Sequence, residues 1–149
     1  MFHKIENKYS KFNYELFDNF IAGIVLTGIE LAKIKQGKVN FTDSCYIYVN
    51  YQNEVYIKNL YIDIATLWDK NAPYKDRKLL LNKFEINKIK RLVQEKKFSI
   101  VPVNIFIDEK SRKIKLTIAL ARGKKLYNKK NAIKERDILK ESNRELKNF

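Results

Sequence analysis

The chain has 149 residues, with 31 Lys and Arg against 17 Asp and Glu, and a formal net charge of +14. This length fits one domain with a single hydrophobic core, and a content of 45% hydrophobic residues favours folding over disorder. A positive excess of this size is common in proteins that bind nucleic acid, because phosphates attract Lys and Arg. A Lys-rich composition whose charges are merely solvated is the alternative.

Several classes of protein are disfavoured by the residues that the chain lacks. With Cys45 as the one cysteine and His3 as the one histidine, an internal disulfide and a zinc site of the usual Cys/His type are excluded. Cys45 lies among alternating strand residues, so we expect a small buried side chain rather than a nucleophile. No stretch reaches the roughly 20 apolar residues of a membrane span, and we expect a cytoplasmic protein.

Catalytic and cofactor motifs are also missing from the sequence. The four glycines form no phosphate-binding loop, and the acidic residues show no spacing that implies shared metal or acid–base chemistry. We therefore expect neither an enzyme nor a bound cofactor or metal.

The first half of the chain predicts strands interrupted by a short helix. Aromatic and β-branched residues in 13–27 indicate two short strands on either side of Asp18. The alternation stops in 28–37, where Gly37 ends the segment, so one or two helical turns are expected. A period of two returns in 43–50, with Cys45, Ile47 and Val49 expected on one face and Tyr46 and Tyr48 on the other.

The middle of the chain predicts further strands, a loop and the best helix. After a turn at 51–53, one or two strands are expected in 54–64, followed by a polar loop in 66–77. Asn82 and Glu85 have the spacing of a capping box at the start of the helix. The apolar stripe of this helix is expected to comprise Phe84 (or Leu81), Ile86, Ile89, Leu92 and Val93.

The last predicted strands form a hairpin. Apolar residues alternate in 99–108 and again in 112–121, with a turn between them at 108–111. Pro102 cannot donate a ladder hydrogen bond, so it marks an edge or a bulge. These elements together predict a mainly β protein, an OB-like antiparallel β-barrel of about six strands with two or three peripheral helices. OB-like barrels bind oligonucleotides through one strand face and its neighbouring loops.

A basic C-terminal tail follows the barrel. Residues 121–149 hold ten basic and four acidic residues, and so carry nearly half of the net charge in about a fifth of the length. A helix here would have only a narrow apolar stripe and would be marginal alone, so we expect a tail that is helical or disordered and that becomes ordered on a partner. A frayed helix lying on the barrel is the alternative. We divide the chain into a barrel, 1–122, and a tail, 123–149.

Four ordered blocks of the sequence form one recognisable pattern. They are AGIVLTGIELAKIKQGKVNFTDSCYIYV (22–49), RKLLLNKFEI (77–86), VQEKKFSIVPVNIFI (93–107) and ALARGKKLYNKKNAIKERD (119–137). Together these blocks resemble the small protein B (SmpB) family, the partner of transfer-messenger RNA. The chain departs from the family pattern at Ile21, Ala32 and Asn128, and none of these changes removes the positive charge.

The resemblance implies a function and a set of contact residues. The barrel would hold the tRNA-like domain of transfer-messenger RNA and deliver it to stalled ribosomes, while the tail enters the empty decoding centre and message channel, against ribosomal RNA. The residues that it places against transfer-messenger RNA are Asn7, Lys8, Glu30, Lys33, Lys35, Lys38, Arg77, Lys78, Arg122, Lys124 and Lys125. Those that it places in the ribosome-binding tail are Gly123, Tyr127, Lys129, Lys130, Lys134 and Arg136. A monomer without a membrane partner is the simplest expectation.

Other interpretations remain open at the level of the sequence. Glu30 could be an internal hydrogen-bond acceptor that holds a loop for RNA, and individual lysines could be solvated only. A generic single-strand-binding OB module would use aromatic stacking at Tyr46, Tyr48 or Tyr56. A cationic tail that docks on acidic membranes is a third possibility.

Overall fold

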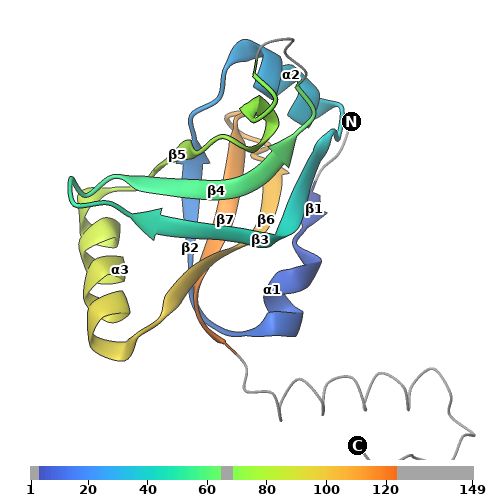
Figure 1. Ribbon diagram of the computed structural model, residues 1–149. Coiled ribbons are helices and arrows are strands. Elements are labelled where there is room, and N and C mark those ends of the chain that lie inside the picture. Colours follow the sequence, from blue (N-terminus) through green and yellow to red (C-terminus); the bar gives the residue numbers. More distant parts are fainter. Residues whose placement is uncertain (1–3, 65–68, 124–149) are drawn as a thin grey trace, which may run out of the picture.

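The computed structural model describes residues 4–64 and 69–123 (Figure 1). Its elements in chain order are β1 (Lys4–Glu6), α1 (Lys8–Asn13), β2 (Tyr14–Ile24), α2 (Gly28–Lys35), β3 (Val39–Val49), β4 (Val55–Ile62), the 3-10 turn η1 (Ala72–Tyr74), β5 (Arg77–Leu80), α3 (Lys83–Lys96), β6 (Ser99–Ile107) and β7 (Ile114–Gly123). None of the helices in these two ranges is long and apolar enough to cross a membrane.

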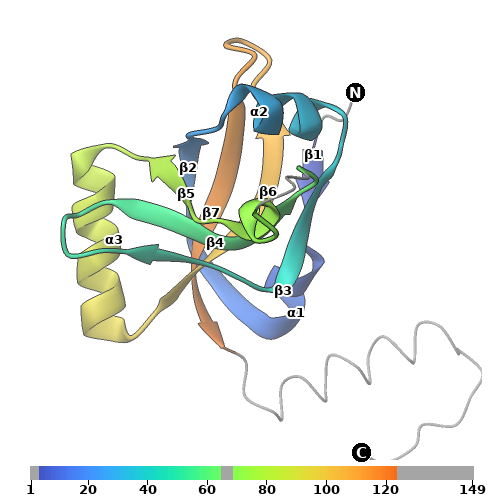
Figure 2. The same cartoon turned by 45° about the horizontal axis from the view of Figure 1, so that its top comes forward.

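Six strands close into an antiparallel barrel. They follow the order β6-β3-β4-β5-β2-β7, and β7 pairs with β6 again to complete the circle, while β1 adds to β6 from outside. The two views show α2 across one end of the barrel and α3 beside the turn that joins β3 to β4 (Figures 1 and 2). The predicted mainly β barrel of about six strands with peripheral helices is confirmed.

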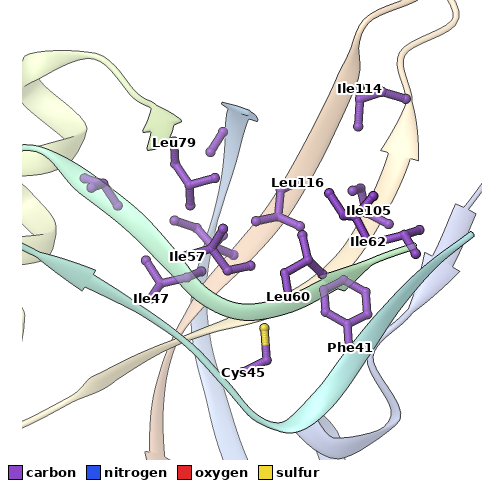
Figure 3. Close-up of a cluster of buried hydrophobic side chains, with 14 of the residues drawn as sticks. Phe41, Cys45, Ile47, Ile57, Leu60, Ile62, Leu79, Ile105, Ile114 and Leu116 are labelled. Atoms are coloured by element: carbon purple, nitrogen blue, oxygen red, sulfur yellow. The ribbon is translucent and has the colours of Figure 1, made fainter. Parts of the chain in front are cut away.

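The core lies between the β3–β4 pair and the strands opposite it (Figure 3). Among its fully buried side chains are Ile57, Leu60, Ile105, Leu116 and Ile118. Burying an aliphatic side chain of this size contributes about 1.5–3 kcal/mol, so the alternating apolar residues of the strands are the main source of stability.

A bulge interrupts the pairing of β3 with β4. Phe41 pairs with Leu60 and Tyr46 with Lys58, so residues 42–45 lie opposite Asn59 alone. Asn59 has a left-handed backbone, with φ of 65°. A bulge of this kind bends its strand strongly. The β3–β6 seam next to the bulge is correspondingly weak, with one matched pair among the described residues, Ile47 with Ile100.

The start of α3 and its capping box were predicted correctly, because they depend on local sequence. A short helix was expected at α2 as well, but its capping box was not. Thr27 and Glu30 form a capping box at the start of α2, and Asn82 and Glu85 form another at the start of α3. The structure decides the one position of the predicted apolar stripe of α3 that was left open between Phe84 and Leu81. Leu81 packs against the core, whereas the Phe84 side chain is 78% exposed.

Several short elements were not predicted from the sequence. The expected pair of strands in 13–27 is the single strand β2, whose register shifts between Leu16 and Asn19. The elements β1 and α1 were missed, and so was β5, which begins at Arg77, the last residue of the expected loop. The bulge expected at Pro102 is confirmed, because the β6–β7 register shifts between Pro102 and Asn104.

Candidate nucleic-acid interface

A buried ion pair organises the end of the barrel that α2 covers. Glu30, in the first turn of α2, is 1% exposed, and Arg77, the first residue of β5, is 2% exposed. The Nε atom of Arg77 donates to Oε2 of Glu30, at 2.5 Å. The Oε1 atom of the same carboxylate accepts the backbone N–H of Thr27 at 2.9 Å. One carboxylate thus joins the helix cap to a strand.

The other four N–H groups of Arg77 hold backbone carbonyls. Nη1 donates to the carbonyls of Leu60 and Lys75, at 2.7 and 3.1 Å, and Nη2 donates to those of Ala72 and Pro73, at 3.2 and 3.1 Å. A guanidinium has five N–H donors, so every donor of this buried charge is satisfied. The residue therefore fixes η1 and the segment before β5 against β4 and α2.

The ionised form of Glu30 is favoured inside this cluster. Burial alone would raise the pKa of the Glu30 carboxyl, but the hydrogen bond from the Thr27 backbone and the hydrogen bond and charge of Arg77 outweigh it, with a smaller contribution from Lys75. The net effect is a pKa held below its ordinary value of 4.5. The Lys75 ammonium lies 3.9 Å from Oε2, and its side chain is 46% exposed. Sequence reasoning missed this lysine, although it lies only two residues before Arg77.

Three of the predicted RNA-contact residues are not on the surface. Glu30 and Arg77 are enclosed as described, and Asn7 is 5% exposed. The Asn7 amide donates to the carbonyl of Pro102 at 2.8 Å and accepts from the backbone N–H of Tyr9 at 3.1 Å. Their polar atoms are used within the protein, so the structure assigns them a positioning role. For Glu30 this arrangement agrees with the alternative raised from the sequence, in which it is an internal hydrogen-bond acceptor.

The predicted lysine contacts of the barrel are accessible, and they lie in three places. Lys35 and Lys38 are exposed and Lys33 is half-buried, all at the α2 end. Lys8 is exposed on α1, which lies toward the opposite end of the barrel (Figure 1). The half-buried Lys78 lies on the outer wall, with its ammonium 3.0 Å from Glu54.

Arg122 lies where β7 ends. Its guanidinium carbon is 5.1 Å from the ring centroid of Phe98 and 5.9 Å from that of Phe17. A guanidinium over aromatic rings keeps its charge accessible while its stem is packed. The next residue, Gly123, is exposed and pairs with Tyr14, and a Cβ added there would meet no atom within 4 Å.

The rest of the predicted tail lies outside the described residues. This applies to the helical or disordered tail itself and to the predicted contacts Lys124, Lys125, Tyr127, Lys129, Lys130, Lys134 and Arg136. Within 4–64 and 69–123, no group of three or more His, Cys, Asp or Glu could hold a metal ion.

Comparisons with known proteins agree with this architecture. The family model described as SmpB protein matches residues 4–148. The SsrA-binding protein of Bacteroides thetaiotaomicron is 44% identical over 136 residues, covering 89% of this chain and 88% of that protein, and the SsrA-binding protein of Parabacteroides distasonis is 44% identical over 147 residues, covering 97% and 94%.

A solved structure agrees as well. A chain from work on tmRNA-SmpB and the centre of the bacterial ribosome matches with a TM-score of 0.67 and 32% identity, over 87% of this chain and 94% of that chain. The chain is therefore similar to these proteins in sequence over nearly its whole length, and it is similar to the solved chain in its barrel. The chain belongs to the SmpB family.

Proposed function

We propose that this protein binds transfer-messenger RNA through its barrel and delivers it to stalled ribosomes in trans-translation. The observation that carries the proposal is the likeness, in both sequence and barrel fold, to a chain solved in work on tmRNA-SmpB and the ribosome. Relatives that cover up to 97% of the chain are SsrA-binding proteins, which supports the same RNA partner. The proposed role is one of binding and positioning rather than catalysis, and it would be carried out in the cytoplasm, where ribosomes act.

The barrel supplies a rigid, basic surface for this task. The Glu30–Arg77 pair fixes α2 relative to η1, and exposed lysines such as Lys35 and Lys38 stand at the same end. Lysines that are held at defined positions gain more from phosphate contacts than lysines on a mobile surface, because less entropy is lost on binding. Counterion release should make the binding strongly dependent on salt.

The division of labour between barrel and tail is part of the proposal. Residues 1–122 would hold the RNA, and residues 123–149 would probe the empty decoding centre and message channel. The charge of the tail supports this, since residues 123–149 carry nine of the 31 basic residues of the chain. The ring of Tyr127 would stack on a base, which a phenol can do irrespective of base identity.

A truncation tests this division. A chain that ends after Gly123 should bind the tRNA-like fragment of transfer-messenger RNA nearly as tightly as the full chain, and it should fail to support peptide tagging on stalled ribosomes. Competition with an unrelated RNA of equal length should leave binding of the fragment largely intact. If the truncated chain loses RNA binding but still supports tagging, the division is wrong. Equal competition by the unrelated RNA would instead favour a generic single-strand-binding module.

A further inference from the structure

Three tyrosines form a continuous row on the outer face of β3 and β4. Tyr48 pairs with Tyr56 across the two strands, with ring centroids 5.7 Å apart and planes at 22°. The ring of Tyr46 lies 6.3 Å from that of Tyr48. Residues two apart on a strand share a face with their cross-strand partners, so the row extends along and across the sheet.

The core does not require this row. The inward faces of the same strands are filled by Cys45, Ile47, Val55 and Ile57, all of which are buried. Tyr46, in contrast, is 41% exposed. The hydrophobic core is thus filled without these rings. Aromatic rings that stack on the surface without serving the core are typical of a binding face.

The middle ring of the row is held in place. The Tyr48 hydroxyl donates to Oδ2 of Asp76 at 2.6 Å, just before β5. This hydrogen bond is the main cause that raises the pKa of the Tyr48 phenol to about 12, so the phenol keeps the proton that it donates to Asp76. A stacking platform whose orientation is set in advance loses little entropy when a ligand binds.

Lysines alternate with the rings. Lys58 is the cross-strand partner of Tyr46, and Lys78 is the partner of Tyr56 on β5. Lys90 reaches from α3 to the turn between β3 and β4, where its ammonium donates to Asn53. Aromatic rings interleaved with cations are suited to unpaired nucleotides, because bases stack on rings while phosphates meet the charges.

A cavity opens beside the row, at the β3–β6 seam. Its volume is about 640 Å³, and its lining includes Tyr46, Tyr48, Val93 and Phe98. The bulge at 42–45 and the weak pairing of β3 with β6 explain why the barrel is open here. The size lies within the range of small-ligand pockets. Polar side chains at the cavity, Asp43, Asn59, Lys90 and Gln94, could hydrogen-bond the edge of a base.

We propose that the outer face of β3, β4 and β5 is a second RNA-binding surface, which takes a single-stranded segment by stacking its bases on the tyrosine row and seating one base in the seam cavity. In this barrel β3 and β4 are the second and third strands, the position through which OB-type barrels bind oligonucleotides. The surface lies on the barrel wall, apart from the α2 end that the proposed function uses for folded RNA (Figure 1). Of the predicted transfer-messenger RNA contacts, Lys78 lies on this wall, where it pairs with Tyr56.

Binding of a short labelled RNA by the full-length protein tests the proposal. The probe is a mixed-sequence RNA of about eight nucleotides, within the range that one OB-type barrel covers, and the readout is fluorescence anisotropy. Tyr46→Ala and Tyr56→Ala should each weaken binding at least about fivefold, the lower end of the loss for one stacked base. Tyr46→Phe should retain binding. Tyr51, which is 90% exposed in the turn, is the matched control, and Tyr51→Ala should have no effect.

Two further measurements separate this surface from the proposed function. The tRNA-like fragment should bind the Tyr46→Ala variant as tightly as it binds the wild type. If the wild type does not bind the fragment at all, that result counts against the proposed function and not against the second surface. A 4-thiouridine version of the short RNA should cross-link to residues of β3, β4 or α3. Cross-links confined to the α2 end or to 124–149, or equal affinity of the tyrosine variants and the wild type, would overturn the second surface.

Discussion

The carboxylate of Glu30 and the guanidinium of Arg77, 47 residues apart in the chain, form one buried ion pair at the α2 end of the barrel. The pair connects the first turn of α2, the end of β4, the η1 turn and the start of β5. Both residues were expected to contact RNA, and the structure shows them buried, with their polar atoms bonded inside the barrel.

Removing one partner of the Glu30–Arg77 pair should strongly destabilise the fold. Arg77→Met should lower the free energy of unfolding by about 3–5 kcal/mol, because the Glu30 charge would stay buried without its partner. Four backbone carbonyls would also lose their donor. Urea denaturation followed by circular dichroism measures the change.

A double variant and a surface control sharpen this prediction. Arg77→Met with Glu30→Gln should recover part of the loss, because no uncompensated charge remains. Lys78→Met, one residue further on the outer wall, should change stability by less than about 1 kcal/mol. Equal effects of the Arg77 and Lys78 substitutions would show that the buried pair has no special weight.

The same pair should make stability depend on acid. The pKa of Glu30 is lowered in the folded chain from its ordinary value of 4.5, so the unfolded state binds the proton more readily. The stabilisation is then fully present above the unfolded pKa and is lost as the pH falls through the folded one. Urea midpoints at a series of pH values below about 5 should fall less steeply for Glu30→Gln than for the wild type. Parallel curves would contradict the assignment.

The thiol of Cys45 should be unreactive in the native protein. Burial raises its pKa to about 12, with Arg77 opposing this in part, and only the thiolate is a nucleophile. We expect slow reaction with a disulfide reagent at about pH 8 and rapid, complete reaction in denaturant. Fast labelling of the native protein would contradict this expectation. It would mean that the seam cavity, which Cys45 lines, opens far enough to admit the reagent and to expose the thiol to water, where it can ionise.

The contribution of the α3 capping box to stability should be measurable with a single substitution. Asn82→Ala removes the acceptor of the Glu85 backbone N–H, a bond of 2.8 Å, and should destabilise the protein by about 1 kcal/mol. Asn87, exposed within the same helix, is the control, since Asn87→Ala should be neutral or slightly stabilising. If both substitutions have the same effect, the cap does not contribute.

Local patterns predicted the elements that local forces build. The start of α3 and the β6–β7 hairpin follow from a capping box, two alternating runs and a turn, all within short stretches of chain. The elements β1, α1 and β5 have three, six and four residues, too few for a period to show. They form because neighbours hold them, as the Asn7 amide holds α1 against the carbonyl of Pro102.

The sequence suggested residues for the candidate site but could not give their arrangement. A charged residue is expected on the surface unless a partner of opposite charge offsets its desolvation. For Arg77 that partner is Glu30, which lies in a distant segment of the chain. The tyrosines of β3 and β4 were visible as one face of an alternating strand. Their continuity as a row, and the cavity beside it, depend on cross-strand register and on the bulge opposite Asn59.

The amino-acid sequence by itself determined the alternating strands, the capped helix α3, the concentration of charge after the barrel and the family to which the chain is similar. These follow from residue spacing and residue type, which act over a few positions. Only the tertiary structure decided that Glu30, Arg77 and Asn7 are internal, that Phe84 is exposed, and that the barrel is open at the β3–β6 seam. Burial and register are set by contacts between segments far apart in the chain, so no local pattern contains them.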